Sequence, residues 1–139
     1  MRAVLDVNVI VSALLSRAGA PAELLRAWNR GEYDLVVSRL LLAELERTLN
    51  YPKLRDRIRP DEARSLLQWL ETSATVAGDP KGPPPIGSPD PGDDYLIALA
   101  AEARAVLVSG DKHLLGLAAD MPIMSPDRFL QLLQEEGAG

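Results

Sequence analysis

Residues 4–15, VLDVNVIVSALL, decide the fold of this chain. Residues 2–7 have the pattern of a buried strand, and residues 8–15 follow almost at once with a helical pattern. Asp6 interrupts the apolar run, although burying a carboxylate without a partner costs several kcal/mol. A strand that ends in an acid and passes directly into a helix therefore raises the question of what the acid does at that place.

Short apolar runs and longer amphipathic ones alternate along the rest of the chain. Gly31 ends the second helical pattern, Ser38 caps the third, and Pro52 stops it. The patterns predict strands over 33–37, 74–77, 105–109 and 123–124, and helices over 21–30, 40–49, 61–72, 93–103, around 112–118 and over 127–136.

Buried strands that alternate with helices predict an α/β fold, with a parallel sheet covered by helices on both faces. Right-handed crossovers make this a doubly wound sandwich, and the length predicts a single domain over residues 1–139. Residues 78–92 contain six prolines and four glycines, which predicts a loop that is too long for a simple connector.

Cysteine is absent, which excludes disulfides, thiol nucleophiles and zinc sites with cysteine ligands. The first apolar run is too short to span a bilayer, and no signal-peptide pattern precedes the fold. We therefore expect a soluble, cytoplasmic protein without a membrane partner.

The net charge of −5 is unevenly distributed. Residues 1–59 hold ten Lys or Arg and seven Asp or Glu, whereas residues 60–139 hold five and thirteen. An acidic protein can still bind a polyanion if metal ions neutralise its acids and a basic rim attracts the ligand.

Acidic residues follow the predicted strands where the carboxyl ends of a parallel sheet place ligands. Asp6 follows the first strand, Asp111 follows the strand 105–109, and Asp93 and Asp94 open the helix after the long loop. Each Asp could instead be a simple N-cap. Glu44 lies on the helix after the second strand, where Glu44 and Glu46 flank the apolar stripe about equally.

Several carboxylates at one sheet edge repel each other unless cations lie among them. Oxygen ligands without thiolates suit Mg²⁺ or Mn²⁺. Two such ions can hold a phosphodiester and activate water, and this chemistry needs no histidine. The only histidine, His113, is expected to be a surface or packing residue.

Four stretches, in this order, resemble the PIN-domain ribonucleases, in particular the VapC-like toxins of toxin–antitoxin pairs: VLDVNVIVSALL, LLAELERTL, DPGDDYLIALA and VSGDKHLL. The resemblance implies a parallel α/β/α fold, Mg²⁺- or Mn²⁺-dependent cleavage of single-stranded or loop RNA, a homodimer and an antitoxin partner. Its acidic quartet, which would be both catalytic and metal-binding, matches Asp6, Glu44, Asp94 and Asp111. Its supporting polar positions match Asn8 and Ser109, and Asp93 is given a supporting role.

In the mechanism that we expect, a metal-activated water attacks the RNA phosphate in line while Arg17, Arg39 and Arg47 hold the backbone. Two alternatives remain open at this stage. A haloacid-dehalogenase-like phosphatase also has an acid after its first strand, but usually has a second Asp where this chain has Asn8. A non-catalytic, receiver-like binding module also carries clustered acids, but has no use for Glu44.

Overall fold

The computed structural model describes residues 1–138. Five strands form one sheet in the order β3-β2-β1-β4-β5, and every neighbouring pair is parallel. This confirms the predicted parallel α/β fold. The strands are β1 (Arg2–Leu5), β2 (Asp34–Val37), β3 (Thr75–Val76), β4 (Val106–Val108) and β5 (Ile123–Met124).

Helices connect the strands and cover the sheet. The helices are α1 (Val7–Leu15), α2 (Ala20–Asn29), α3 (Arg39–Leu49), α4 (Pro52–Arg55), α5 (Pro60–Ser73), a 3₁₀ turn η1 (Pro91–Asp93), α6 (Asp94–Ala103), α7 (Lys112–Leu115) and α8 (Pro126–Ala138).

Local chemistry sets several boundaries. β1 is shorter than predicted because Asp6 already caps α1, accepting a hydrogen bond from the N–H of Asn8. Ser38 caps α3 as predicted, with its hydroxyl oxygen 3.2 Å from the Leu41 nitrogen. Pro52 does more than stop α3: it occupies the first turn of α4, where its missing N–H costs nothing.

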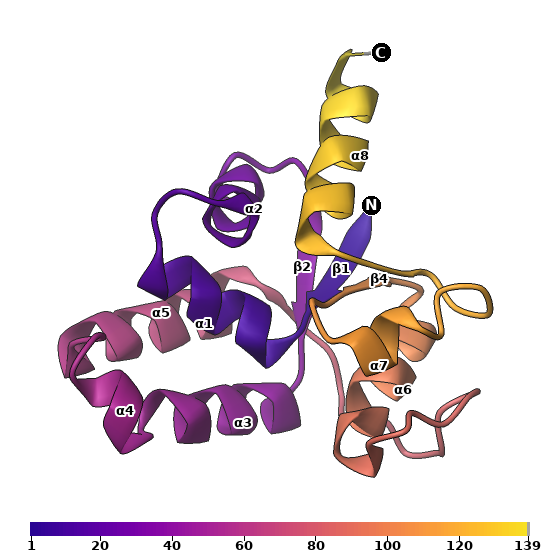
Figure 1. Ribbon diagram of the computed structural model, residues 1–139, viewed down its shortest axis with the longest axis horizontal. Helices are drawn as coiled ribbons and strands as arrows, with labels where there is room; N and C mark the ends of the chain where they lie inside the picture. The colour runs from indigo at the N-terminus through magenta and orange to yellow at the C-terminus, as the bar shows by residue number, and fades with distance from the viewer. Residues whose placement is uncertain (139) are drawn as a thin grey trace.

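The direction of the crossovers distributes the helices over two layers (Figure 1). From β1 to β2 to β3 the chain moves outward in one direction, and α1 to α5 lie on one side of the strands. The chain then returns past β1 to β4, and α6 and α7 lie on the other side. The order of the strands therefore reverses between β1 and β4, which are hydrogen-bonded neighbours.

Aromatic contacts hold the outer helices in the one apolar core that the described residues form. Trp28 of α2 packs on Trp69 of α5, with ring centroids 4.4 Å apart. Phe129 of α8 is fully buried and meets Tyr33 edge to face at 5.2 Å. Within residues 1–138, none of the helices combines the length and the apolar composition needed to cross a bilayer.

The segment 78–92 has no regular secondary structure before η1, as predicted. Two aspartates attach it to the fold. Near its beginning, Asp79 accepts a 3.0 Å hydrogen bond from the N–H of Leu40, at the start of α3. Near its end, the N–H of Ser88 donates a 2.8 Å hydrogen bond to Asp94 of α6. The loop is thus fixed at both ends beside the carboxyl edge of the sheet.

Candidate active site

The carboxyl ends of β1 and β4 form the centre of the candidate site. Doubly wound sheets bind ligands where the strand order reverses, because the loops diverge there and leave a crevice. Asp6 directly follows β1, and its N–H donates a 2.9 Å hydrogen bond to the carbonyl of Val108 at the end of β4. The backbone of Asp6 is thereby fixed at this position.

The Asp6 side chain is almost completely buried, with 6% of the residue exposed. Its carboxylate accepts a 2.7 Å hydrogen bond from the Ser109 hydroxyl and a longer one, 3.4 Å, from the Asn8 N–H. Burial raises the pKa of Asp6, the two hydrogen bonds oppose this rise, and the nearby Asp111 charge adds to it. The fold thus maintains an acid whose negative charge is poorly compensated.

Ser109 connects Asp6 to Asp111. Ser109 is fully buried, and its oxygen accepts a 3.0 Å hydrogen bond from the Asp111 N–H while its hydroxyl donates to Asp6. Asp111 also caps α7, accepting the N–H of His113 at 2.8 Å. Asp111 therefore both caps α7 and belongs to the acidic site. His113 itself lies on the surface, with its Nδ1 3.7 Å from Asp111.

The structure separates the two neighbouring acids of α6 and η1. The pKa of Asp93 is raised to about 6, first by burial and then by the charges of Asp6, Asp90 and Asp111. Asp94 instead accepts the N–H of Ser88 and holds the loop. Asp93, to which the sequence assigned a supporting role, therefore lies near Asp6 and Asp111. Asp94, predicted as a member of the acidic quartet, uses one carboxylate oxygen for the Ser88 N–H. Consecutive residues at a helix start point about 100° apart, so the two carboxylates have different surroundings.

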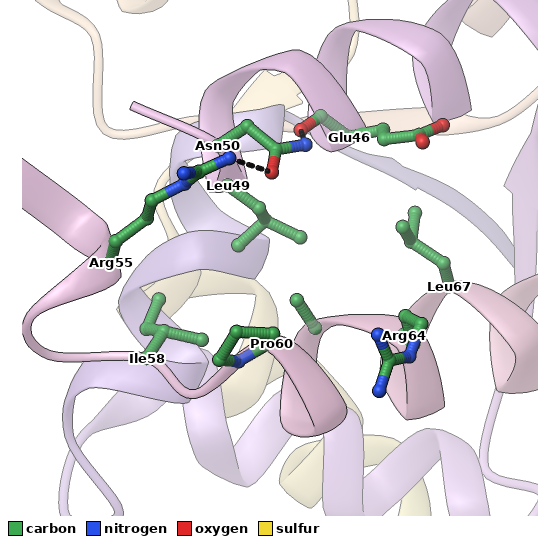
Figure 2. A pocket seen from close by; sticks show the side chains of 9 residues that line it. Glu46, Leu49, Asn50, Arg55, Ile58, Pro60, Arg64 and Leu67 are labelled. Atoms are coloured by element: carbon green, nitrogen blue, oxygen red, sulfur yellow. Dashed lines mark hydrogen bonds between the residues drawn. The ribbon is translucent and has the colours of Figure 1, made fainter. Parts of the chain in front are cut away.

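Glu44 and Glu46 are separated in the same way. Glu44 is half-buried and forms an ion pair with Arg47. Glu46 is exposed and lines a different cavity of about 360 Å³ between α3, α4 and α5, together with Asn50 and Arg55 (Figure 2). The wheel position could not decide between the two glutamates, whereas the packing of α3 does.

Tyr95 is the residue at this site that the sequence did not indicate. Its pKa is raised by burial first and then by the charges of Asp6, Glu44 and Asp93. Tyr95 therefore lies near Glu44 of α3 as well as near Asp6 and Asp93. Only its position directly after the Asp93–Asp94 pair could have drawn attention to it.

The three arginines predicted to bind RNA lie in different places. Arg39 is the exposed first residue of α3, at the carboxyl edge of β2. Arg47 pairs with Glu44 and lies near Tyr95. Arg17 lies beyond the opposite end of α1 from Asp6, in a cavity with Leu25 and Trp69. The structure thus brings Arg39 and Arg47, but not Arg17, toward the acidic rim.

The donor set of this rim fits a hard divalent cation by its chemistry. All of its ligating atoms are oxygens, which Mg²⁺ and Mn²⁺ prefer, and the mutual repulsion of the acids would be relieved by positive charge. The acids do not form a closed cage: among the described residues, no three His, Cys, Asp or Glu side chains are positioned to hold one ion together.

Comparisons with known proteins agree with this fold. A family model described as PIN domain matches residues 2–113. The structure of VapBC2 from Rickettsia felis bound to a DNA fragment from their promoter is 17% identical, with a TM-score of 0.57, and covers 90% of this chain and 97% of its own. FitAcB from Neisseria gonorrhoeae is 18% identical, with a TM-score of 0.56, and covers 89% of this chain and 97% of its own. A search of curated proteins found no match.

The chain therefore belongs to the PIN-domain family, since the family model matches most of its length. At 17% and 18% identity, the two solved structures show the shared fold. Membership in this family replaces the phosphatase and receiver-like alternatives that the sequence had left open.

Proposed function

We propose that this PIN-domain protein is a divalent-metal-dependent endoribonuclease that hydrolyses phosphodiester bonds of single-stranded or loop RNA. PIN domains are generally nucleases, which supports hydrolysis of nucleic acid. The observation that carries the proposal for this chain is the hydrogen-bonded series Asp6–Ser109–Asp111, with Asp93 in the same field, at the reversal of strand order.

We assign Asp6, Asp93, Asp111 and Glu44 to the metal-binding and catalytic set, with Mg²⁺ or Mn²⁺ as the ion. When bound, a divalent cation activates water and neutralises charge at the phosphate. Ser109 holds Asp6 in one orientation and opposes the rise in its pKa, because its hydroxyl donates to the carboxylate.

The remaining residues act on the substrate and on the loop. Arg39 and Arg47 offset the negative charge of the RNA backbone at the rim. Asp94 holds the end of the proline-rich loop beside the site through Ser88. The side chain of Asn8 borders the cavity next to Asp111, where it can contact the RNA.

We further propose that the protein is the toxin of a toxin–antitoxin pair. The two solved structures of similar fold are toxin–antitoxin complexes, which supports an antitoxin partner for this chain. We also propose that the protein acts in the cytoplasm and forms a homodimer, which size-exclusion chromatography with light scattering would detect.

The test is a time course on mixed single-stranded RNA with Mg²⁺ or Mn²⁺, with EDTA, and with an Asp6→Asn variant. We expect cleavage that EDTA abolishes and that the variant loses although it folds. Equal cleavage by Asp6→Asn, or cleavage unaffected by EDTA, would overturn the proposal.

A further inference from the structure

A cavity of about 660 Å³ opens beside the acidic rim. Asn8 and Ser12 of α1, Asp111 before α7 and Asp127 of α8 border it, and so do residues 19–21 at the start of α2. The beginnings of α1 and α8 both border this cavity. Its volume is within the range of roughly 300–1,000 Å³ that small-molecule sites have. Because Asp111 belongs to both, the cavity is continuous with the site.

We propose that this cavity binds one nucleobase of the RNA next to the scissile phosphate, and that Asp127 and Ser12 select the base. The inference rests on the proposed ribonuclease function and specifies how the same site recognises its substrate.

The lining favours an uncharged occupant over a phosphate. No Lys or Arg lines the cavity, whereas two carboxylates, Asp111 and Asp127, do. A phosphate placed there would meet like charge at short range. Apart from Asn8 and Ser12, the rest of the wall is small or apolar, with Val9, Pro21 and Pro126 among its members.

A nucleobase fits the same wall. Proteins that read an unstacked base pack its faces against apolar or aromatic side chains and bond its edge with polar groups. Pro21 and Pro126 offer apolar surface, and Ser12 and Asp127 offer polar atoms. Among the interactions within the described chain, neither Ser12 nor Asp127 has a side-chain hydrogen bond or an ion pair. Both are therefore available to a ligand.

The chemistry of Asp127 determines which bases are preferred. An ionised carboxylate only accepts hydrogen bonds, so it pairs with the amino groups of cytosine, adenine or guanine. Uracil presents a carbonyl oxygen where cytosine presents its amino group, and that oxygen would face the carboxylate. The cavity should therefore disfavour uracil at one position beside the cleavage point.

The experiment uses a random-sequence single-stranded RNA pool, cleaved by the full-length protein with Mn²⁺ and sequenced at the new ends. The variants are Asp127→Asn and Ser12→Ala. The control is Asp120→Asn, which removes the same charge from an exposed turn outside the cavity. We expect wild type and Asp120→Asn to discriminate against uracil at one position by roughly fivefold or more.

Asp127→Asn should lose most of that discrimination, because the amide can also donate to a carbonyl, and Ser12→Ala should weaken it. Total cleavage of the pool by the Asp120→Asn control should match that of wild type. Cleavage with unchanged base preference in both variants would overturn the base pocket alone. A uniform rise in RNA affinity of Asp127→Asn, without a change in preference, would instead identify a backbone contact and also overturn it. No metal-dependent cleavage by wild type would refute the proposed function, and this inference with it.

Discussion

The Ser109 hydroxyl donates a 2.7 Å hydrogen bond to the Asp6 carboxylate across 103 positions of sequence. The same oxygen accepts the N–H of Asp111. One buried side chain thus orients two acids that follow different strands, and it opposes the rise in the pKa of Asp6 that burial causes. The packing of β1 beside β4 makes this possible, because it brings the two strand ends together.

Ser109→Ala should therefore impair both stability and activity. It removes a donor from a buried carboxylate, which should lower the free energy of unfolding by roughly 1–3 kcal/mol. The pKa of Asp6 should rise further, so half-maximal activity should need more metal, with a loss of roughly 10–100-fold in activity at fixed metal. Urea unfolding and a Mn²⁺ titration of RNA cleavage measure the two effects.

Ser38→Ala is the matched control for that experiment. Ser38 is equally buried, but it caps α3. Its loss should cost roughly 0.5–2 kcal/mol without changing the metal requirement. If both variants shifted the metal titration equally, the special role of Ser109 would be refuted.

Substitution of Asp93 should reduce RNA cleavage far more than substitution of its neighbour Asp94. Asp93→Asn should reduce cleavage at least about 100-fold, since even residues behind a metal ligand cost roughly 10–100-fold. Asp94→Asn retains an oxygen that can accept the Ser88 N–H, so we expect less than about a threefold change. Single-turnover cleavage of one RNA by both variants is the measurement. The reverse order of the two losses would return the catalytic assignment to Asp94.

Asp93 should also make stability depend on pH in the absence of metal. Its pKa is about 6 in the folded protein against 3.8 as the ordinary value, so the folded state binds more protons between these values. The contribution of Asp93 to the free energy of unfolding therefore falls as the pH rises from about 4 to 6, and the loss is complete above that range. Asp93→Asn should be more stable than wild type at pH 8, and this advantage should shrink at pH 5. Urea unfolding in EDTA measures it, and an advantage independent of pH would contradict the shift.

Metal binding should reverse this destabilisation. A ligand that binds only the folded state stabilises it by about 2.7 kcal/mol at a hundred times its dissociation constant. Mn²⁺ should therefore raise the Tm of wild type in a concentration-dependent manner. The double variant Asp6→Asn with Asp111→Asn should show no such rise, and an equal rise in both proteins would place the metal elsewhere.

Arginines at the rim should affect RNA binding more than distant ones. Arg47→Gln should weaken binding and reduce the slope of log affinity against log salt by about 0.7 if it contacts one phosphate of a single strand. Arg17→Gln removes the same charge from the α2–α5 side and should leave the slope unchanged. Fluorescence anisotropy in EDTA at several salt concentrations measures both. Equal slopes for the two variants would show that position at the rim does not matter.

Much of the fold could be predicted because local patterns determine it. Three local features each act on neighbouring residues: the apolar run of residues 3–5, the cap at Ser38 and the prolines of residues 78–92. Each places an element boundary within a few positions. Alternation of such elements with right-handed crossovers leaves few topologies. The position of Asp6 at the carboxyl edge followed from the same reasoning.

Choices between neighbouring or equivalent side chains depended on tertiary packing. Whether Asp93 or Asp94 faces Asp6, and whether Glu44 or Glu46 faces the rim, depends on the rotation of α6 and α3 about their axes, which distant contacts set. Tyr95 lies near the acids, and the cavity at Asp127 forms, only because helices far apart in the chain begin at the same sheet edge. The sequence by itself determined which residue types could form an acidic site, and three-dimensional packing decided which of them meet.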